Sequence, residues 1–230
     1  MDLALFDFDG TLTTSETWTP FVRRIAGAKP SLARRLTVAP AILAHRAGLI
    51  SSSRGRQWAV RALCRGLDAA AVVAAGEAYA ADTLPSVLRA ETVARLIWHR
   101  DRGDRVVVVS ASLDAYLHPW CARLGVDCVC TELEKQGERL TGRYLGGDCS
   151  GPEKAKRVNA RYRLADFSQV HAYGDSGEDR ELLALAHVKT YRGREIAGWN
   201  EVTAFDHPPA TPDTRREIDP TSGGDVGGRR

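Results

Sequence analysis

A chain of 230 residues with 43% apolar content can bury the core of one large domain, or of a core domain with a modest insert. This composition excludes intrinsic disorder as the default interpretation. The formal net charge of +3 is unevenly spread, because residues 15 to 83 hold ten Lys and Arg against four Asp and Glu. That basic segment would attract an anionic substrate, an anionic membrane surface or nucleic acid, and a solvated arginine-rich helical face explains the same counts equally well.

The five cysteines make an odd number with no CxxC pair, so neither a disulfide framework nor a zinc knuckle is expected. Met1 and Asp2 lead at once into a short apolar strand, without the features of a secretory signal. The most apolar helical stretch, residues 38 to 50, is too short to span a bilayer and contains His45 and Arg46. These features predict a cytoplasmic protein, and peripheral membrane contact stays open.

The first predicted element is a short buried strand over residues 3 to 8, which ends in acids before a turn at Gly10. From residue 15 to residue 83 the pattern changes to Ala-, Leu- and Arg-rich helical stretches broken by proline and glycine. No convincing strand is predicted there. The segment therefore reads as a helical insert.

Strand and helix signals then alternate, which is typical of a parallel sheet with crossover helices. The predicted elements are helix 87–102, strand 106–109, helix 113–124, strand 128–131, a hairpin over 132–144, a helix from 153, strand 170–173, helix 179–186 and strand 188–191. We therefore predict an α/β fold with a doubly wound, mostly parallel sheet. The expected domains are a core of residues 1–14 and 84–205, a helical cap of residues 15–83 and a loosely held tail of residues 206–230.

Polar residues follow several predicted strands, at the edge of a parallel sheet where ligands bind. They are Asp7 and Asp9 after the first strand, Ser110 after the second, Lys154 in the helix after the hairpin, and the run Gly174-Asp175-Ser176-Gly177-Glu178-Asp179 after a later strand. Asp7 and Asp9 stand two apart, so an extended chain places both carboxylates on one side. Their repulsion calls for a cation, and Mg²⁺ with further carboxylates from Asp175 and Asp179 would supply it.

Each signal has an ordinary structural explanation when it is taken alone. A DxDG sequence is often a polar turn after a strand, and Ser110 could be a helix N-cap. Lys154 could be a solvated lysine in a first helical turn. Ser110 and the backbone N–H groups after it could instead hold phosphate oxygens. The order of the signals and their strand-end placement favour the functional interpretation.

These residues resemble the four motifs of the haloacid dehalogenase superfamily of phosphohydrolases, over roughly residues 3 to 192. The motifs are matched by Asp7-Phe8-Asp9-Gly10-Thr11, by Ser110 after four valines, by Lys154, and by the run from Gly174 to Asp179. The resemblance implies a Rossmann-like core of mostly parallel strands. It also implies a helical cap of the C1 type inserted after the first motif, as in subfamily IB, which includes phosphoserine phosphatase.

The resemblance implies a role for each motif residue. Asp7 would be the nucleophile and Asp9 the general acid and base. Mg²⁺ would be held by Asp7, Asp175 and the backbone carbonyl of Asp9, and Asp179 would support the site together with Ser176. The phosphate oxygens would contact Gly10, Thr11, Ser110, Ala111 and Lys154.

Within subfamily IB, Leu140 to Tyr144, Asp148 to Lys154 and Asp179 to Ala186 look most like the phosphatidylglycerophosphatase C branch. Phosphoserine phosphatases carry a cap glutamate where Glu16 stands here, but their cap phenylalanine and arginine have no clean counterpart. The basic cap suggests a second contact to an anionic substrate. The candidates for this contact are Arg54, Arg56 and Arg61, and Glu16 is a further candidate substrate-contacting residue of the cap.

We therefore expect a Mg²⁺-dependent hydrolase of a small or lipid-derived phosphate monoester. The alternatives are a phosphoserine phosphatase, a phosphotransferase to an alcohol acceptor, and a non-catalytic phosphate-binding module. Asp9 argues against the last, because superfamily members with other chemistry often lack that acid. No nucleic-acid partner is expected, since no aromatic-interleaved basic platform is present. The sequence leaves the oligomeric state open.

Overall fold

The computed structural model describes residues 1–27, 43 and 47–206, and these residues carry everything that follows. Part of the predicted cap and the predicted tail beyond Asp206 lie outside them. Within the described residues, one seven-stranded sheet has the order β4-β3-β2-β1-β5-β6-β7. Its strands are β1 (Leu3–Phe6), β2 (Arg105–Leu113), β3 (Asp127–Gln136), β4 (Arg139–Leu145), β5 (Val170–Gly174), β6 (Val188–Tyr191) and β7 (Arg194–Ile196).

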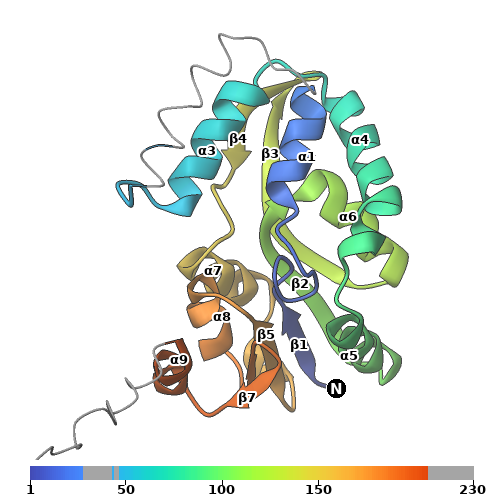
Figure 1. Ribbon diagram of the computed structural model, residues 1–230. Coiled ribbons are helices and arrows are strands. Elements are labelled where there is room, and N and C mark those ends of the chain that lie inside the picture. The colour runs from blue at the N-terminus through green and yellow to red at the C-terminus, as the bar shows by residue number, and fades with distance from the viewer. Residues whose placement is uncertain (28–42, 44–46, 207–230) are drawn as a thin grey trace, which may run out of the picture.

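The central strands β3, β2, β1, β5 and β6 pair in parallel, and the edge strands β4 and β7 are antiparallel. The helices are α1 (Trp18–Ala26), α3 (Ser52–Leu63), α4 (Ala69–Asp82), α5 (Ala90–Asp101), α6 (Asp114–Leu124), α7 (Pro152–Arg161), α8 (Arg180–Ala184) and α9 (Trp199–Asp206), with 3-10 turns at Leu84–Val87, Leu164–Asp166 and Gly177–Asp179. Figure 1 shows α5 and α6 on one side of the sheet and α7 and α8 on the other. The predicted α/β class with a mostly parallel sheet is confirmed.

The alternation of side chains along the central strands divides the core into two layers. On β2, Val106 and Val108 belong to the layer under α5 and α6, whereas Val107 and Val109 belong to the layer under α7 and α8. Both faces are covered, so the strand can be apolar throughout, as buried parallel strands usually are. The run of four valines is explained by this double burial.

Helices α1, α3 and α4 lie beside the long β3–β4 hairpin, beyond the end of β1 (Figure 1). Helix α4 packs tightly on α6, where Gly76 meets the backbone carbonyl of Ala115 so closely that a Cβ would clash. Pro119 lacks the N–H that would normally bond this carbonyl within α6. These helices lie within the segment predicted as the cap, and the division into cap and core stays a proposal.

Several boundaries differ from the predictions. Strand β2 extends to Leu113, past its predicted end at Val109, with an irregularity in its pairing with β3 between Ser110 and Leu113, and α6 begins at Asp114. Ser110 is therefore not a helix N-cap. The short edge strand β7 and helix α9 were not predicted, since three-residue strands give little periodic signal. No helix among the described residues is long and apolar enough to cross a membrane.

Candidate active site

Asp7 lies one residue beyond β1, at the carboxyl end of the parallel sheet. Its backbone N–H donates to the carbonyl of Tyr173 at 3.0 Å, which extends the pairing of β1 with β5 and fixes the start of the loop. The Asp7 side chain is buried, and its Oδ1 accepts a hydrogen bond from Lys154 Nζ at 2.5 Å. The strand thus delivers a carboxylate into an enclosed polar site.

Lys154 is buried at 2% exposure in the first turn of α7 and lies between two carboxylates. Its Nζ donates to Asp7 Oδ1 and to Asp179 Oδ1, each at 2.5 Å. Burial alone would lower the pKa of Lys154, but the charges of Asp7 and Asp179 raise it well above its usual range. Lys154 is therefore a fixed ammonium group and not a solvated lysine.

Asp179 orients both Lys154 and the loop that follows β5. Its Oδ2 accepts from the backbone N–H groups of Asp175 and Ser176 and from the Ser176 hydroxyl, at 3.0 to 3.1 Å. Gly174 permits this turn, because a Cβ there would lie 2.6 Å from the Asp179 Cβ. The Gly-Asp-Ser sequence is thus shaped around a buried carboxylate.

Asp175 faces the loop that follows Asp7. Its Oδ1 accepts from the Thr11 hydroxyl at 3.3 Å. Gly10 has a φ of +87°, and a Cβ at this position would collide with the Asp175 carboxylate. Only glycine satisfies both conditions without strain.

Oxygen atoms of Asp7, Asp175 and Asp179 lie within 4.8 Å of one another, which brings together three of the predicted acids. Burial first, and then the charge of Asp179, raise the pKa of Asp7 well above its ordinary value. The same two causes raise the pKa of Asp175. Three carboxylates beside the single ammonium of Lys154 leave an excess of negative charge, and this oxygen donor set fits a hard divalent cation.

Asp9 is held in a different environment from Asp7. Its Oδ1 accepts from the backbone N–H and the hydroxyl of Thr17 at 3.0 and 2.6 Å, and its Oδ2 accepts from the Ser112 hydroxyl at 2.5 Å. Burial raises the pKa of Asp9 to about 6, against the lowering effect of these hydrogen bonds. A carboxyl group with that pKa can exchange a proton near neutral pH.

Thr17, Ser112 and Tyr116 are site residues that the sequence did not suggest. The Thr17 hydroxyl, which donates to Asp9, lies 3.1 Å from the Tyr116 hydroxyl, so Tyr116 helps to hold Thr17 in place. None of the three directly follows a predicted strand, so choosing candidates at the ends of predicted strands did not include them. Ser112 lies on β2, but the strand was predicted to end at Val109, so Ser112 fell in the predicted connection to the next helix.

Ser110 and Ala111 lie where the pairing of β2 with β3 becomes irregular. Ser110 is buried, and its Oγ accepts the backbone N–H of Ser112 at 3.0 Å. This bond holds Ser112 in place beside Asp9. The phosphate contacts predicted for Ser110 and Ala111 stay a prediction.

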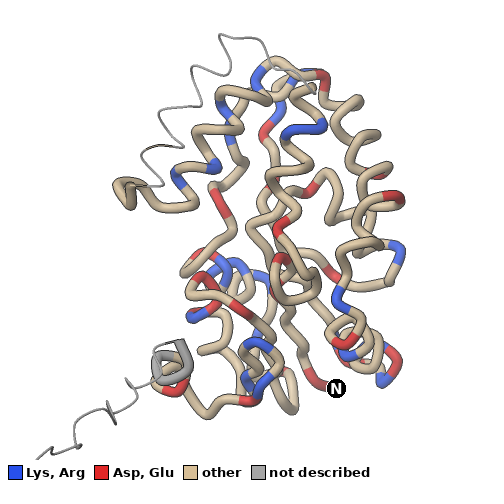
Figure 2. The backbone as a smooth tube through the Cα atoms, in the orientation of Figure 1, with Lys and Arg blue, Asp and Glu red and all other residues tan. Residues whose placement is uncertain are grey.

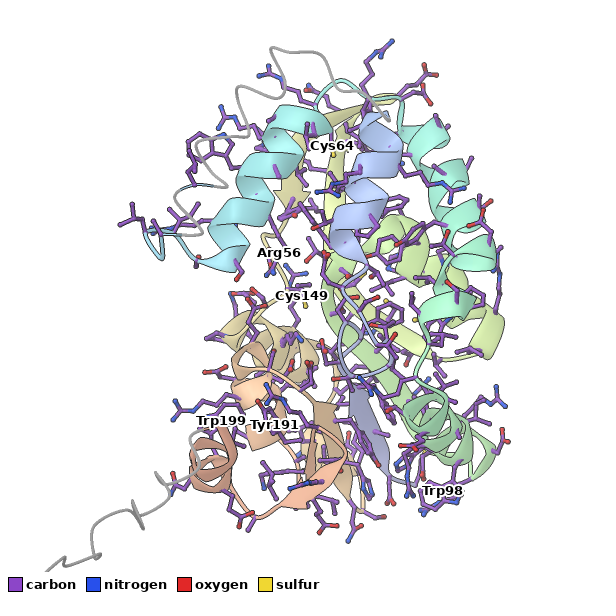
Figure 3. All side chains as sticks on the ribbon, in the orientation of Figure 1. Arg56, Cys64, Trp98, Cys149, Tyr191 and Trp199 are labelled. Carbon is purple, nitrogen blue, oxygen red and sulfur yellow. The ribbon has the colours of Figure 1, made fainter. Side chains whose placement is uncertain are left out.

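The four predicted cap candidates have different surroundings. Arg56 extends from α3, with its Nε 2.9 Å from Asp148 Oδ2 and its Nη2 3.2 Å from Glu178 Oε2. Figure 3 shows Arg56 close to Cys149, in the space between α3 and α7. Arg54 and Arg61 are exposed on the same helix, along which Figure 2 shows several basic residues. Glu16 is exposed and accepts the backbone N–H of Thr19 at 2.6 Å.

Comparison with known proteins gives the class of this chain. Residues 4–184 match the family model described as haloacid dehalogenase-like hydrolase. The chain belongs to this family, as the motifs predicted. Among curated relatives, protein CicA of Caulobacter vibrioides is 34% identical over 196 residues, which cover 83% of this chain and 85% of that protein.

Solved structures share the fold at lower identity. A protein of unknown function from Bordetella pertussis Tohama I is 24% identical with a TM-score of 0.71, over 89% of this chain and 95% of that one. A probable phosphoserine phosphatase from Vibrio cholerae is 18% identical with a TM-score of 0.62, over 83% of this chain and 55% of that one. A substrate-bound phosphoserine phosphatase is 19% identical with a TM-score of 0.56, over 88% of this chain and 97% of that one. The predicted kinship in fold with phosphoserine phosphatases is thus confirmed, and the resemblance to phosphatidylglycerophosphatase C stays a prediction.

Proposed function

We propose that this protein is a Mg²⁺-dependent phosphatase that hydrolyses phosphate monoesters through an aspartyl-phosphate intermediate. The observation that carries the proposal is the contrast between Asp7 and Asp9. Asp7 is paired with an ammonium group among other carboxylates, whereas Asp9 is hydrogen-bonded by hydroxyls and has a pKa of about 6. Two carboxyl groups in different environments are suited to two different roles in one reaction.

In the first step, an Asp7 oxygen attacks phosphorus and the bond to the ester oxygen breaks. Asp9 gives its proton to that oxygen, so the alcohol leaves neutral. In the second step, Asp9 takes a proton from water, whose oxygen attacks the phosphorus and releases phosphate from Asp7. A positioned acid and base of this kind is worth about 10²–10⁴ in rate.

The residues that would hold Mg²⁺ are Asp7, Asp175 and the backbone carbonyl of Asp9, with Asp179 supporting the loop. The ion would stabilise negative charge on the transferring phosphoryl group. Lys154, Ser110 and the backbone N–H groups of the surrounding loops would add positive charge and hydrogen-bond donors. Asp179 keeps Lys154 and the Asp175 loop in position through the contacts described above.

The substrate is proposed to be a small or lipid-derived phosphate monoester. Phosphoserine is one candidate, because the fold is shared with phosphoserine phosphatases. Transfer of the phosphoryl group to an alcohol is the second candidate reaction, since the aspartyl phosphate would accept either nucleophile. We keep a cytoplasmic location and peripheral membrane contact as part of this proposal.

The test is phosphate release from a panel of phosphoserine, glycerol phosphates, sugar phosphates, nucleotides and lysophospholipid phosphates. We expect activity with Mg²⁺, loss of activity in excess chelator, and poor support by Ca²⁺, whose larger and looser shell positions the attack less well. Asp7→Asn should abolish turnover and leave the circular dichroism spectrum unchanged. Phosphate release by Asp7→Asn at the wild-type rate would exclude the mechanism, and a requirement for added alcohol would favour the transferase.

A further inference from the structure

A second group of metal-ligating side chains lies between α6 and β3, apart from the carboxylate cluster. His118 and Cys121 are three residues apart on α6, so they share a helix face. Cys128 and Cys130 are two apart on β3, so they share a strand face. Cys121, Cys128 and Cys130 all pack in the core layer under α6, which turns the two faces toward each other.

The ligand atoms of His118, Cys128 and Cys130 lie within 4.8 Å of one another. Cys130 Sγ is 3.6 Å from His118 Nε2. With Zn–S bonds of about 2.3 Å and Zn–N bonds of about 2.0–2.1 Å, a tetrahedral zinc ion holds such ligand atoms roughly 3.5–3.8 Å apart. The thiol of Cys121 interacts with Cys128, but it lies outside the group whose ligand atoms are all within 4.8 Å of one another, so it would become a fourth ligand only after its side chain adjusts.

Hydrogen bonds between thiols would explain one close pair. Here Cys121, Cys130 and His118 all lie near enough to the Cys128 thiol to act on it, so this sulfur is the centre of the cluster. Thiolate is the form of cysteine that binds metals, so zinc binding would require these thiols to lose their protons. The carboxylates of Asp114 and Glu132 act on His118 and make the surroundings favourable to a cation.

We propose that His118, Cys128 and Cys130 hold a zinc ion that fastens α6 to β3, with Cys121 completing the tetrahedron after its side chain adjusts. Binding would release the thiol protons and leave His118 as a neutral ligand. Both elements border the candidate active site, since Cys130 pairs with Ser110 across the sheet and Tyr116 of α6 contacts Thr17. None of the proposed ligands takes part in the proposed phosphatase reaction, so the role of the ion would be structural: it would hold together two elements that border the active site.

The first experiment measures zinc in full-length protein purified with reductant and without chelator, or reconstituted with Zn²⁺ and dialysed. We expect about one zinc ion per chain, as in closed structural sites. Cys128→Ser and Cys130→Ser should bind it more than about tenfold more weakly, since even loss of an outer-shell partner costs roughly 10–100-fold. Cys149→Ser is the matched control, because Cys149 packs in the opposite core layer and bonds the Val129 carbonyl.

Replacement of zinc by Co²⁺ identifies the ligands without any variant. Thiolate ligation gives charge-transfer bands in the near ultraviolet and strong visible bands, whereas Co²⁺ on the carboxylate cluster gives neither. His118→Asn, at an exposed position, serves if a cysteine variant fails to fold. Asp175→Asn should retain the zinc.

The proposal is overturned if reduced wild-type protein keeps less than about a tenth of a zinc ion per chain after reconstitution. A cobalt spectrum without thiolate bands would also overturn it. Equal zinc loss in Cys149→Ser and Cys128→Ser would remove the ligand assignment. Formation of a Cys121–Cys128 disulfide in place of metal binding would identify the cluster as a redox pair.

Discussion

Lys154 donates from its ammonium group to Asp7, 147 residues earlier in the chain, at 2.5 Å in a site closed to solvent. The same group bonds Asp179, so the first strand, helix α7 and the loop after β5 meet at one cation. Removing one partner of a buried ion pair leaves an uncompensated charge, which costs more than the pair itself contributes. The contact thus gives Lys154 a part in the stability of the fold beside its proposed part in catalysis.

Lys154→Met should lower the free energy of unfolding by about 3–5 kcal/mol, because Asp7 and Asp179 would then face each other without a cation. Urea unfolding of both proteins measures this loss. Added Mg²⁺ should recover part of it if the carboxylates bind the ion. Lys156→Met, two residues on in α7 at 76% side-chain exposure, is the control and should change stability by less than about 0.5 kcal/mol. Equal losses in the two variants would contradict the importance of the buried contact.

Asp9→Asn should slow turnover by roughly 10²–10⁴, because the amide cannot transfer the proton that Asp9 is proposed to carry. An aryl phosphate with a good leaving group should lose less in the first step than an alkyl phosphate. Rapid-mixing measurement of the alcohol burst compares the two. Asp101→Asn, at the exposed end of α5, controls for the loss of a carboxylate. If both substrates lost the same factor in the burst, Asp9 would not protonate the leaving group.

The sequence predicted the parts of the site that follow strand ends. Asp7 and Asp175 come directly after β1 and β5, and parallel pairing of these strands brings the two ends to one edge. Lys154 was in the same census, as a residue of the helix after the hairpin, and the resemblance favoured a functional role for it over a solvated lysine in a first helical turn. Those residues depend on strand order alone, and strand order is what alternating helix and strand signals predict.

The rest depended on tertiary contacts that no local pattern records. Thr17 reaches Asp9 only because α1 returns over the end of β1, and Ser112 does so only because β2 continues past Ser110. The cysteines of α6 and β3 were judged by their spacing in the sequence, which contains no CxxC. Their approach comes from the packing of a helix on a strand, across a connection of a few residues.

The buried side chain of His99 should make the stability of the fold depend on pH. It is fully buried, with Nδ1 2.9 Å from Asp104 Oδ2 and Nε2 2.9 Å from the Tyr173 hydroxyl. Burial lowers the pKa of His99 despite the hydrogen bond to Asp104, and the charges of the nearby His171 and Arg102 also lower it. The folded state therefore binds fewer protons than the unfolded state below the unfolded pKa.

Stability should accordingly fall as pH drops below about 6.5, the ordinary pKa of histidine, by at most about 1.4 kcal/mol for each pH unit from this group. Asp104, whose pKa is also lowered, adds a loss at more acidic pH, near its unfolded value. Urea unfolding between pH 7.5 and 5.5, chosen to span about one unit on each side of that pKa, tests the first effect. His99→Gln keeps a polar partner without titrating, and its pH dependence should be shallower. An unchanged slope in this variant would assign the effect to other groups.

Arg56 of helix α3 connects the predicted cap to the predicted core. Its guanidinium bonds both oxygens of Asp148, whose side chain is 2% exposed, and it also reaches Glu178 in the loop after β5. A bidentate pair of this kind is geometrically specific. An anionic group on the substrate would have to displace these carboxylates before it could bind Arg56.

Arg56→Gln should therefore lower the free energy of unfolding by about 3–5 kcal/mol, because Asp148 would remain buried and unpaired. Arg54→Gln, exposed on the same helix, should change it by less than about 0.5 kcal/mol. Asp148→Asn combined with Arg56→Gln should recover part of the loss, and a double-mutant cycle gives the coupling. Kinetics on p-nitrophenyl phosphate and on a substrate with a second anionic group test whether Arg56 also binds substrate. If Arg56 bound the second anionic group, Arg56→Gln would weaken binding of only the second substrate, by about 1.5–3 kcal/mol. Additive stability losses, with no coupling between Arg56 and Asp148, would show that the ion pair does not hold the predicted cap on the core.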